Sequence, residues 1–212
     1  MCIRFTKLHG AGNDFIFVDA ADLPIAMNPA LAAWLCDRHF GVGGDGVLVF
    51  QRTSDGAPWM RIFNSDGSHA EMCGNGIRCF VKELVERHGF VSPVRVVTDA
   101  GTKECLLSER DGTTWVQVSM GEIRSDTGEV LSEVNYQPAT VEVGGRLLQL
   151  VLVSTGNPHA VLFGCFSRQE MERLGPAITT HPRFPQGTNV EFVTVKGRRE
   201  LDVTVHERGA GF

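Results

Sequence analysis

The clearest helical pattern in the chain lies between residues 77 and 85. Apolar residues recur there at intervals of three and four positions, which is the spacing of a helix with one buried face. They are Ile77, Phe80, Val81, Leu84 and Val85. The run Cys73-Gly74-Asn75-Gly76 precedes them, and Gly89, a residue that commonly ends a helix, follows. The pattern predicts a buried helix that begins just after Cys73 and ends near Gly89.

Short apolar runs separated by glycine-containing turns surround this helix, which favours short strands and hairpins. The predicted strands of the first half are 3–9, 15–19, 47–50, 61–64, 94–98, 102–108 and 113–119. Asn28 and Pro29 are typical of a helix start, with asparagine as the N-cap and proline in the first turn. We expect Leu31, Trp34 and Leu35 to form the apolar side of this second helix.

A second arrangement of strands follows the polar stretch 121–128, which we interpret as a connector between domains 1–119 and 120–212. Gly144 and Gly145 predict a two-residue hairpin turn. Ser167 and Glu170 form a capping box that predicts a helix through Leu174. The predicted strands of this half are 138–143, 146–153, 160–163, 188–193 and 201–205.

Composition narrows the class of protein. The chain has 212 residues, of which 42% are hydrophobic and 21% charged, as in ordinary globular proteins. A net charge of −5 gives no reason to expect nucleic acid or an anionic membrane as a partner. No apolar run approaches the roughly 18 residues that span a bilayer, and the N-terminus lacks a signal-peptide pattern. We therefore expect a cytoplasmic protein.

Two sequence features exclude common kinds of site. The six cysteines form no C-x-x-C pair and no His/Cys metal-binding spacing, so we expect free thiols and no metal site. The glycine-rich loop 41–46 lies between a helix and a strand, the reverse of the order in phosphate-binding loops, and no Gly-Lys-Ser/Thr follows. We interpret it as a loop that shapes the backbone.

Cys73 is the one cysteine whose surroundings predict reactivity. At the start of a helix, unpaired N–H groups and the helix dipole favour a thiolate. Gly74 and Gly76 let a ligand approach the backbone around Asn75. The site suits a base, a nucleophile or carboxylate binding, whereas the alternative is a small buried residue ahead of a helix.

The two halves of the chain echo each other weakly. Gly12-Asn13 precedes a strand in the first half, and Gly156-Asn157 precedes one in the second. Cys73 follows Asn13 by 60 residues (73 − 13), and the same interval after Asn157 leads to position 217, beyond residue 212. On this pattern we expect the second half to stop before a cysteine-bearing helix of its own.

A series of motifs along the whole chain resembles the diaminopimelate epimerase family. Each motif alone is modest, but their order is highly specific. They are FTKLHGAGNDF (5–15), DRHFGVG (37–43), RIFNSDGS (61–68), EMCGNG (71–76), GNPH (156–159), TNV (188–190) and ERGAG (207–211).

This resemblance implies an α/β (α+β) fold of two pseudo-symmetric domains, each a curled, mainly antiparallel sheet around a central helix. It implies inversion at the α-carbon of LL- or meso-diaminopimelate, a small-molecule substrate, by two cysteines acting on opposite faces without a cofactor. It also implies a homodimer. The family's second cysteine follows the motif at 207–211, so we expect the second domain to be incomplete and the activity impaired.

The resemblance also implies roles for individual residues. Cys73 would be one acid/base, and His159 and Glu207 would tune the protonation of the thiols. Substrate contacts would come from Asn13, Asn64, Gly74, Asn75, Asn157, Asn189, Glu207 and Arg208. Gly46 stands where some members carry a substrate-contacting glutamine, so that contact is left unassigned.

Two alternatives remain open at this point. The chain is also compatible with a racemase of the same superfamily that acts on another amino acid, of the proline or histidine type. It is also compatible with a non-catalytic fragment, whose second sheet would have an uncovered apolar face.

Overall fold

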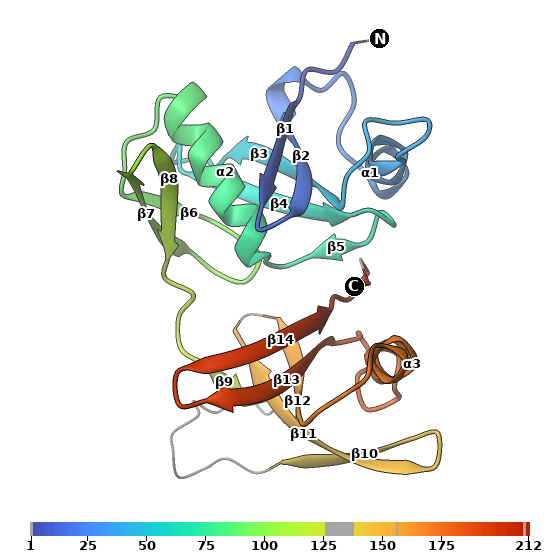
Figure 1. Cartoon of the computed structure of the whole chain (residues 1–212). Helices are drawn as coiled ribbons and strands as arrows, with labels where there is room; N and C mark the ends of the chain where they lie inside the picture. The colour runs from blue at the N-terminus through green and yellow to red at the C-terminus, as the bar shows by residue number, and fades with distance from the viewer. Residues whose placement is uncertain (1, 126–137, 156, 210) are drawn as a thin grey trace. The chain divides into compact units, whose positions relative to one another are not determined.

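The computed structural model describes residues 2–125, 138–155, 157–209 and 211–212. The chain divides into two compact units, Met1–Gly121 and Glu122–Phe212 (Figure 1). This division falls two residues after the boundary expected from the sequence, at 119/120. Positions 126–128 of the expected connector lie outside the described residues. None of the helices in the described ranges is long and apolar enough to cross a membrane.

The first unit contains a five-stranded sheet in the order β1-β2-β3-β4-β5. The pairs are antiparallel except β2 with β3, which run parallel. Ala11 and Gly12 form the β1–β2 turn, and both have positive φ (53° and 87°), as a tight hairpin turn requires. The strands are β1 (Thr6–Gly10), β2 (Asn13–Asp19), β3 (Gly46–Arg52), β4 (Pro58–Asn64) and β5 (His69–Ala70).

Helix α1 (Pro29–Cys36) connects the two parallel strands and covers one face of the sheet. Its predicted start is confirmed, because the Asn28 side chain accepts a hydrogen bond from the Leu31 N–H at 3.0 Å. Its predicted apolar side is partly wrong, because Trp34 is 54% exposed. The helix instead buries the small residues Ala32 and Cys36 beside Leu35, which allows its backbone to approach the sheet closely.

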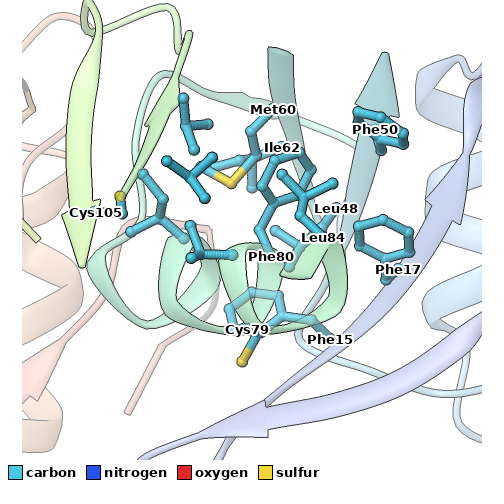
Figure 2. Packing of buried hydrophobic residues seen from close by; sticks show 14 of the residues in the cluster. Phe15, Phe17, Leu48, Phe50, Met60, Ile62, Cys79, Phe80, Leu84 and Cys105 are labelled. Carbon is cyan, nitrogen blue, oxygen red and sulfur yellow. The ribbon is translucent and has the colours of Figure 1, made fainter. Parts of the chain in front are cut away.

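Helix α2 (Gly74–Arg87) covers the opposite face, and the predicted stripe is confirmed. Phe80 is fully buried, with ring centroids 5.6 Å from Phe17 and 5.9 Å from Phe50 (Figure 2). A three-stranded antiparallel sheet completes this core, formed by β6 (Val94–Val96), β7 (Lys103–Arg110) and β8 (Thr113–Val118). Helices on both faces explain why residues 15–18 and 47–50 are continuously apolar.

The second unit repeats this topology. Its sheet has the order β10-β11-β12-β13-β14, and β9 also pairs with β11. All pairs are antiparallel except β12 with β13, which helix α3 (Arg168–Thr179) connects. The strands are β9 (Arg124–Ser125), β10 (Ala139–Val143), β11 (Arg146–Ser154), β12 (Pro158–Phe163), β13 (Asn189–Gly197) and β14 (Glu200–His206).

The register supports the repeat between the two halves. In the first unit Phe15, two residues after Asn13, pairs with Gly46 at the start of the parallel neighbour. In the second unit His159, two residues after Asn157, pairs with Asn189 at the start of the parallel neighbour. The two-domain α+β fold expected from the sequence is therefore confirmed, with Asn13 at the start of β2 and Asn157 one residue before β12.

The two faces of the second sheet differ in burial. Helix α3 packs on one face, where Leu174 and Ile178 are buried. On the other face Phe163, Val195 and Leu201 are 57%, 60% and 58% exposed. The corresponding face of the first sheet, with Phe17 and Phe50, is the one that α2 buries.

Helix α3 begins at the predicted capping box. Ser167 Oγ accepts from the Glu170 N–H at 3.3 Å, and Glu170 Oε2 accepts from the Ser167 N–H at 2.9 Å. The helix runs five residues past the predicted end at Leu174, through Pro176, because Ile178 is buried one turn beyond Leu174.

Ser167→Ala is expected to destabilise α3 by about 1 kcal/mol, because the first turn loses the acceptor for one N–H group. Hydrogen exchange of the peptide spanning 168–179 measures this effect. Ser167→Asp is the control, since aspartate is an equally good N-cap and should preserve protection. Equal protection in the alanine and aspartate variants would contradict the prediction.

Candidate active site

Cys73 is the N-cap residue of α2, as the sequence predicts. Its backbone is extended (φ −142°, ψ 117°), and its Sγ accepts a hydrogen bond from the Gly76 N–H at 3.4 Å. A Cβ on Gly74 would have no neighbour within 4 Å, whereas one on Gly76 would lie 3.0 Å from Leu48 Cδ2. The half-buried thiol therefore lies at the open N-terminal end of a helix whose next turn is tightly packed.

Asn13 and Asn75 lie beside this thiol. Asn13 Oδ1 is 3.9 Å from Cys73 Sγ and 3.5 Å from Asn75 Nδ2. The side-chain oxygen of Asn75, Oδ1, in turn accepts from the Arg78 guanidinium one turn along the helix. The structure therefore brings together the thiol and two of the side chains that the sequence analysis expected around it.

A charged network that the sequence analysis did not identify supports Asn13. Asp45 Oδ2 accepts from Asn13 Nδ2 at 2.8 Å and from the Asp14 N–H at 3.0 Å. The Arg38 guanidinium binds Asp45 Oδ1 at 2.9 Å and Asp14 Oδ1 at 2.7 Å. Lys7 Nζ lies 2.7 Å from Asp14 Oδ2. The parallel pairing of β2 and β3 brings Asp14 and Asp45 side by side.

Electrostatics in this network favour the ionised form of the Asp14 carboxyl group. The hydrogen bonds that Arg38 donates hold the pKa of Asp14 far below its usual range, with burial opposing this effect and Lys7 adding to it. By contrast, burial raises the pKa of the nearby thiol of Cys36 to about 11, and that of Cys79 to about 11.

Asp14→Asn is expected to destabilise the first unit at pH 7 and still at pH 4. A carboxyl group with a lowered folded pKa stabilises the fold above its unfolded pKa of about 3.9, and this contribution disappears only as the pH falls through the folded pKa. Urea unfolding followed by tryptophan fluorescence reports this unit, because Trp34, Trp59 and Trp115 all lie in it.

The control for this prediction is Asp22→Asn, which removes one exposed carboxylate from the same unit. Its unfolding midpoint should follow the wild type at each pH. A difference between Asp14→Asn and wild type that has already vanished at pH 4 would contradict the prediction.

Asn64 and Gly46 lie opposite each other on β4 and β3. Asn64 Nδ2 donates to Ser68 Oγ at 2.9 Å, which holds the turn that leads toward Cys73. A Cβ on Gly46 would lie 2.8 Å from the Phe63 carbonyl oxygen, so a larger residue here requires a shift of the backbone. A glutamine side chain therefore does not fit position 46 of this chain as it stands.

His159 is the centre of a second cluster, in the second unit. Its Nδ1 lies 2.6 Å from Glu191 Oε1, and its Nε2 lies 2.9 Å from Asn157 Oδ1. Glu191 Oε2 is buried and makes no hydrogen bond within the part of the chain that the structure describes. The sequence analysis expected His159 and Asn157 in the site but missed Glu191, which the parallel β12–β13 pairing places beside them.

Hydrogen bonds also hold the backbone near the end of the chain, and they involve Asn189, Glu207 and Arg208. Asn189 is 8% exposed, and its Nδ2 donates to the Pro158 carbonyl at 3.2 Å while its Oδ1 accepts from the Arg208 N–H at 2.9 Å. The backbones of Glu207 and Gly211 exchange two hydrogen bonds of 2.7 and 2.9 Å. Position 156 of one motif and position 210 of the other lie outside the described residues.

Comparison with known proteins shows which family the chain belongs to. Residues 5–125 match the family model described as diaminopimelate epimerase. The diaminopimelate epimerase of Desulfitobacterium hafniense is 44% identical over 219 residues, which cover 99% of this chain and 77% of that protein. Diaminopimelate epimerase 1 of a Nostoc species is 43% identical over 223 residues, covering 100% of this chain and 78% of that protein.

Solved structures share the fold at low sequence identity. A hydroxyproline epimerase from Agrobacterium vitis aligns with a TM-score of 0.70 and 15% identity, over 99% of this chain and 71% of that one. A phenazine biosynthesis protein of the PhzF family from Bacillus anthracis aligns with a TM-score of 0.63 and 14% identity, over 97% and 71%.

The resemblance inferred from the ordered motifs is therefore confirmed by sequence relatives that cover nearly the whole chain. The chain belongs to the diaminopimelate epimerase family, a family of isomerases.

Proposed function

We propose that this protein inverts the α-carbon of diaminopimelate, interconverting the LL and meso isomers, with Cys73 as one acid/base of the reaction. The observation that carries the proposal is the position of the Cys73 thiol. It lies at the N-terminus of α2, beside Asn13 and Asn75, in a chain 44% identical to named diaminopimelate epimerases.

The chemistry follows from this geometry. The Cys73 thiolate would take the α-proton, and the electron pair of the broken C–H bond would remain on the α-carbon and delocalise into the carboxylate. The N–H groups at the start of α2, around Gly74 and Asn75, would stabilise that charge. A thiol on the opposite face would then return a proton to the α-carbon.

The remaining roles are proposals of the same kind. Asn13, Asn64, Asn157, Asn189, Glu207 and Arg208 would hold the ammonium and carboxylate groups of the substrate. His159, paired with Glu191, would tune the protonation of a thiol. We also propose a cytoplasmic location, because the buried thiols Cys36, Cys79 and Cys105 suit a reducing compartment.

Deuterium exchange tests the substrate class. The protein is incubated in deuterium oxide, without pyridoxal phosphate, with diaminopimelate isomers, L-proline, trans-4-hydroxy-L-proline or L-histidine. We expect deuterium to enter the α-carbon of diaminopimelate at least roughly 100-fold faster than that of the other amino acids. A site that hydrogen-bonds the amino and carboxylate groups at the far end of diaminopimelate rejects substrates that lack them.

Two outcomes would contradict the proposal. Faster exchange with proline, hydroxyproline or histidine would assign the chain to a different racemase of the same superfamily. A folded protein that exchanges none of these substrates would be a non-catalytic member.

A further inference from the structure

The orientation of the Asn13 carboxamide is fixed by chemistry. An ionised carboxylate can only accept hydrogen bonds, so the Asn13 atom that lies 2.8 Å from Asp45 Oδ2 must be the nitrogen. The Asp14 N–H donates to the same oxygen at 3.0 Å. The Asn13 carbonyl oxygen consequently faces the other way, toward Cys73 Sγ and Asn75 Nδ2.

Asp45 itself is held on three sides. Its backbone N–H donates to the Asp14 carbonyl at 2.8 Å, one residue before β3 begins. Its second carboxylate oxygen binds the Arg38 guanidinium at 2.9 Å, and Arg38 makes two further hydrogen bonds to Asp14, at 2.7 and 3.1 Å. Because the Asp45 carboxylate is fixed in this way, Asn13 Nδ2 is held toward Asp45 and Asn13 Oδ1 toward the Cys73 thiol.

The result is that each protonation state of the Cys73 thiol has a partner. The Gly76 N–H donates to Sγ and favours the thiolate, whereas Asn13 Oδ1 can accept from the S–H and favours the thiol. A group that must both take and return a proton works best when neither the thiol nor the thiolate is strongly disfavoured. If the Asn13 carboxamide rotated by half a turn, its N–H₂ group would face Sγ instead. Asn13 and the Gly76 N–H would then both favour the thiolate.

From these contacts we propose that Asp45 is a positioning residue, which holds the Asn13 carbonyl toward Cys73 and so sets the balance between thiol and thiolate. The proposal deepens the proposed function, and only its catalytic consequence rests on that function. Asp45 acts through Asn13 and does not itself touch the thiol.

A double-mutant cycle tests the proposal without any substrate. The pH profile of iodoacetamide alkylation at Cys73 is measured by mass spectrometry, in a background where the exposed Cys2 and Cys165 are replaced by serine. The cycle contains Asp45→Ala, Asn13→Ala and the double variant. Asp55→Ala is the matched control, because it removes one carboxylate from an exposed turn of the same unit.

Asp45→Ala is expected to move the alkylation midpoint to lower pH, and to raise the alkylation rate below the midpoint roughly three-fold, because released Asn13 can turn its N–H₂ group to the thiolate. In the Asn13→Ala background, the same substitution should have no larger effect than Asp55→Ala. An equal effect of Asp45→Ala in both backgrounds would mean that it acts by charge alone, and would overturn the proposal. An unchanged midpoint in folded Asp45→Ala would also overturn it.

Asp45→Leu is the second variant if Asp45→Ala does not fold. It keeps most of the size of the side chain but has no atom that can accept from Asn13 Nδ2, so Asn13 is again released. The same direction of shift is expected, and no shift would overturn the proposal.

The experiment separates this proposal from the proposed function. If the alkylation profiles shift as expected while the wild type exchanges no α-proton of diaminopimelate, the positioning role stands and the proposed function fails. If the wild type exchanges that proton but the cycle shows no coupling between Asp45 and Asn13, the proposed function stands and the positioning role fails.

Discussion

Cys73→Ser is expected to lower the rate of α-proton exchange with diaminopimelate roughly 10³-fold, the scale of a lost general base. A serine hydroxyl is far less acidic than a thiol, so at neutral pH it supplies almost no base. The structure makes this substitution a clean test. Cys73 is the N-cap of α2, and serine is a preferred N-cap residue, so the helix should keep or gain stability while the chemistry is lost.

Deuterium incorporation at the α-carbon, followed by mass spectrometry, measures the loss. Cys165→Ser makes the same chemical change at an exposed thiol and should leave the rate within two-fold of the wild type, by the ordinary tolerance of surface positions. A Cys73→Ser rate within ten-fold of the wild type, in a protein with an unchanged melting curve, would remove Cys73 from the role proposed above.

Local signals explain why the starts of the three α-helices could be predicted from the sequence. A helix start is specified within four or five residues, by Asn28 and Pro29 in α1, by the run 73–76 in α2, and by Ser167 and Glu170 in α3. Each of these starts is confirmed by a side chain that accepts from a backbone N–H of the first turn. None of them depends on where the rest of the chain lies.

The exposed face of α1 could not be predicted in the same way. Residues 29–36 are apolar almost all round, so periodicity does not choose between Trp34 and the small residues Ala32 and Cys36. The choice is made by the sheet, whose Ile16 and Val47 come from strands on either side of the helix in sequence. The large indole is excluded from the close helix–sheet contact, and smaller side chains take its place.

The acidic residues of the two clusters were missed for a related reason. Asp45 lies 32 residues from Asn13, and Glu191 lies 32 residues from His159, and in each case the two elements meet only because two strands pair in parallel. Asp45 also stands in a glycine-rich loop that was interpreted as shaping the backbone. Asn13 and Asn157 made the repeat visible in the sequence. Only the register of the parallel strand pairs shows which carboxylate each half places beside them.

Phe80→Ala is expected to cost about 3–5 kcal/mol of the free energy of unfolding of the first unit, a large part of what a domain of this size has. The Phe80 side chain projects from α2 and is fully buried against the sheet, near Phe17 and Phe50 (Figure 2), so truncation leaves a cavity that rigid neighbours cannot close. Cys73 is the N-cap of the same helix, and a less rigid helix would weaken the contact of the thiol with Asn13.

Urea unfolding followed by tryptophan fluorescence measures this cost in the unit that contains all three tryptophans. Phe40→Ala is the matched control, because Phe40 is 83% exposed in the same unit and its truncation should cost less than about 0.5 kcal/mol. Phe80→Leu, which keeps most of the buried volume, should lie between the two and gives a folded variant if the alanine variant does not fold. Equal costs at positions 40 and 80 would mean that α2 is not packed as described, and the placement of Cys73 would fail with it.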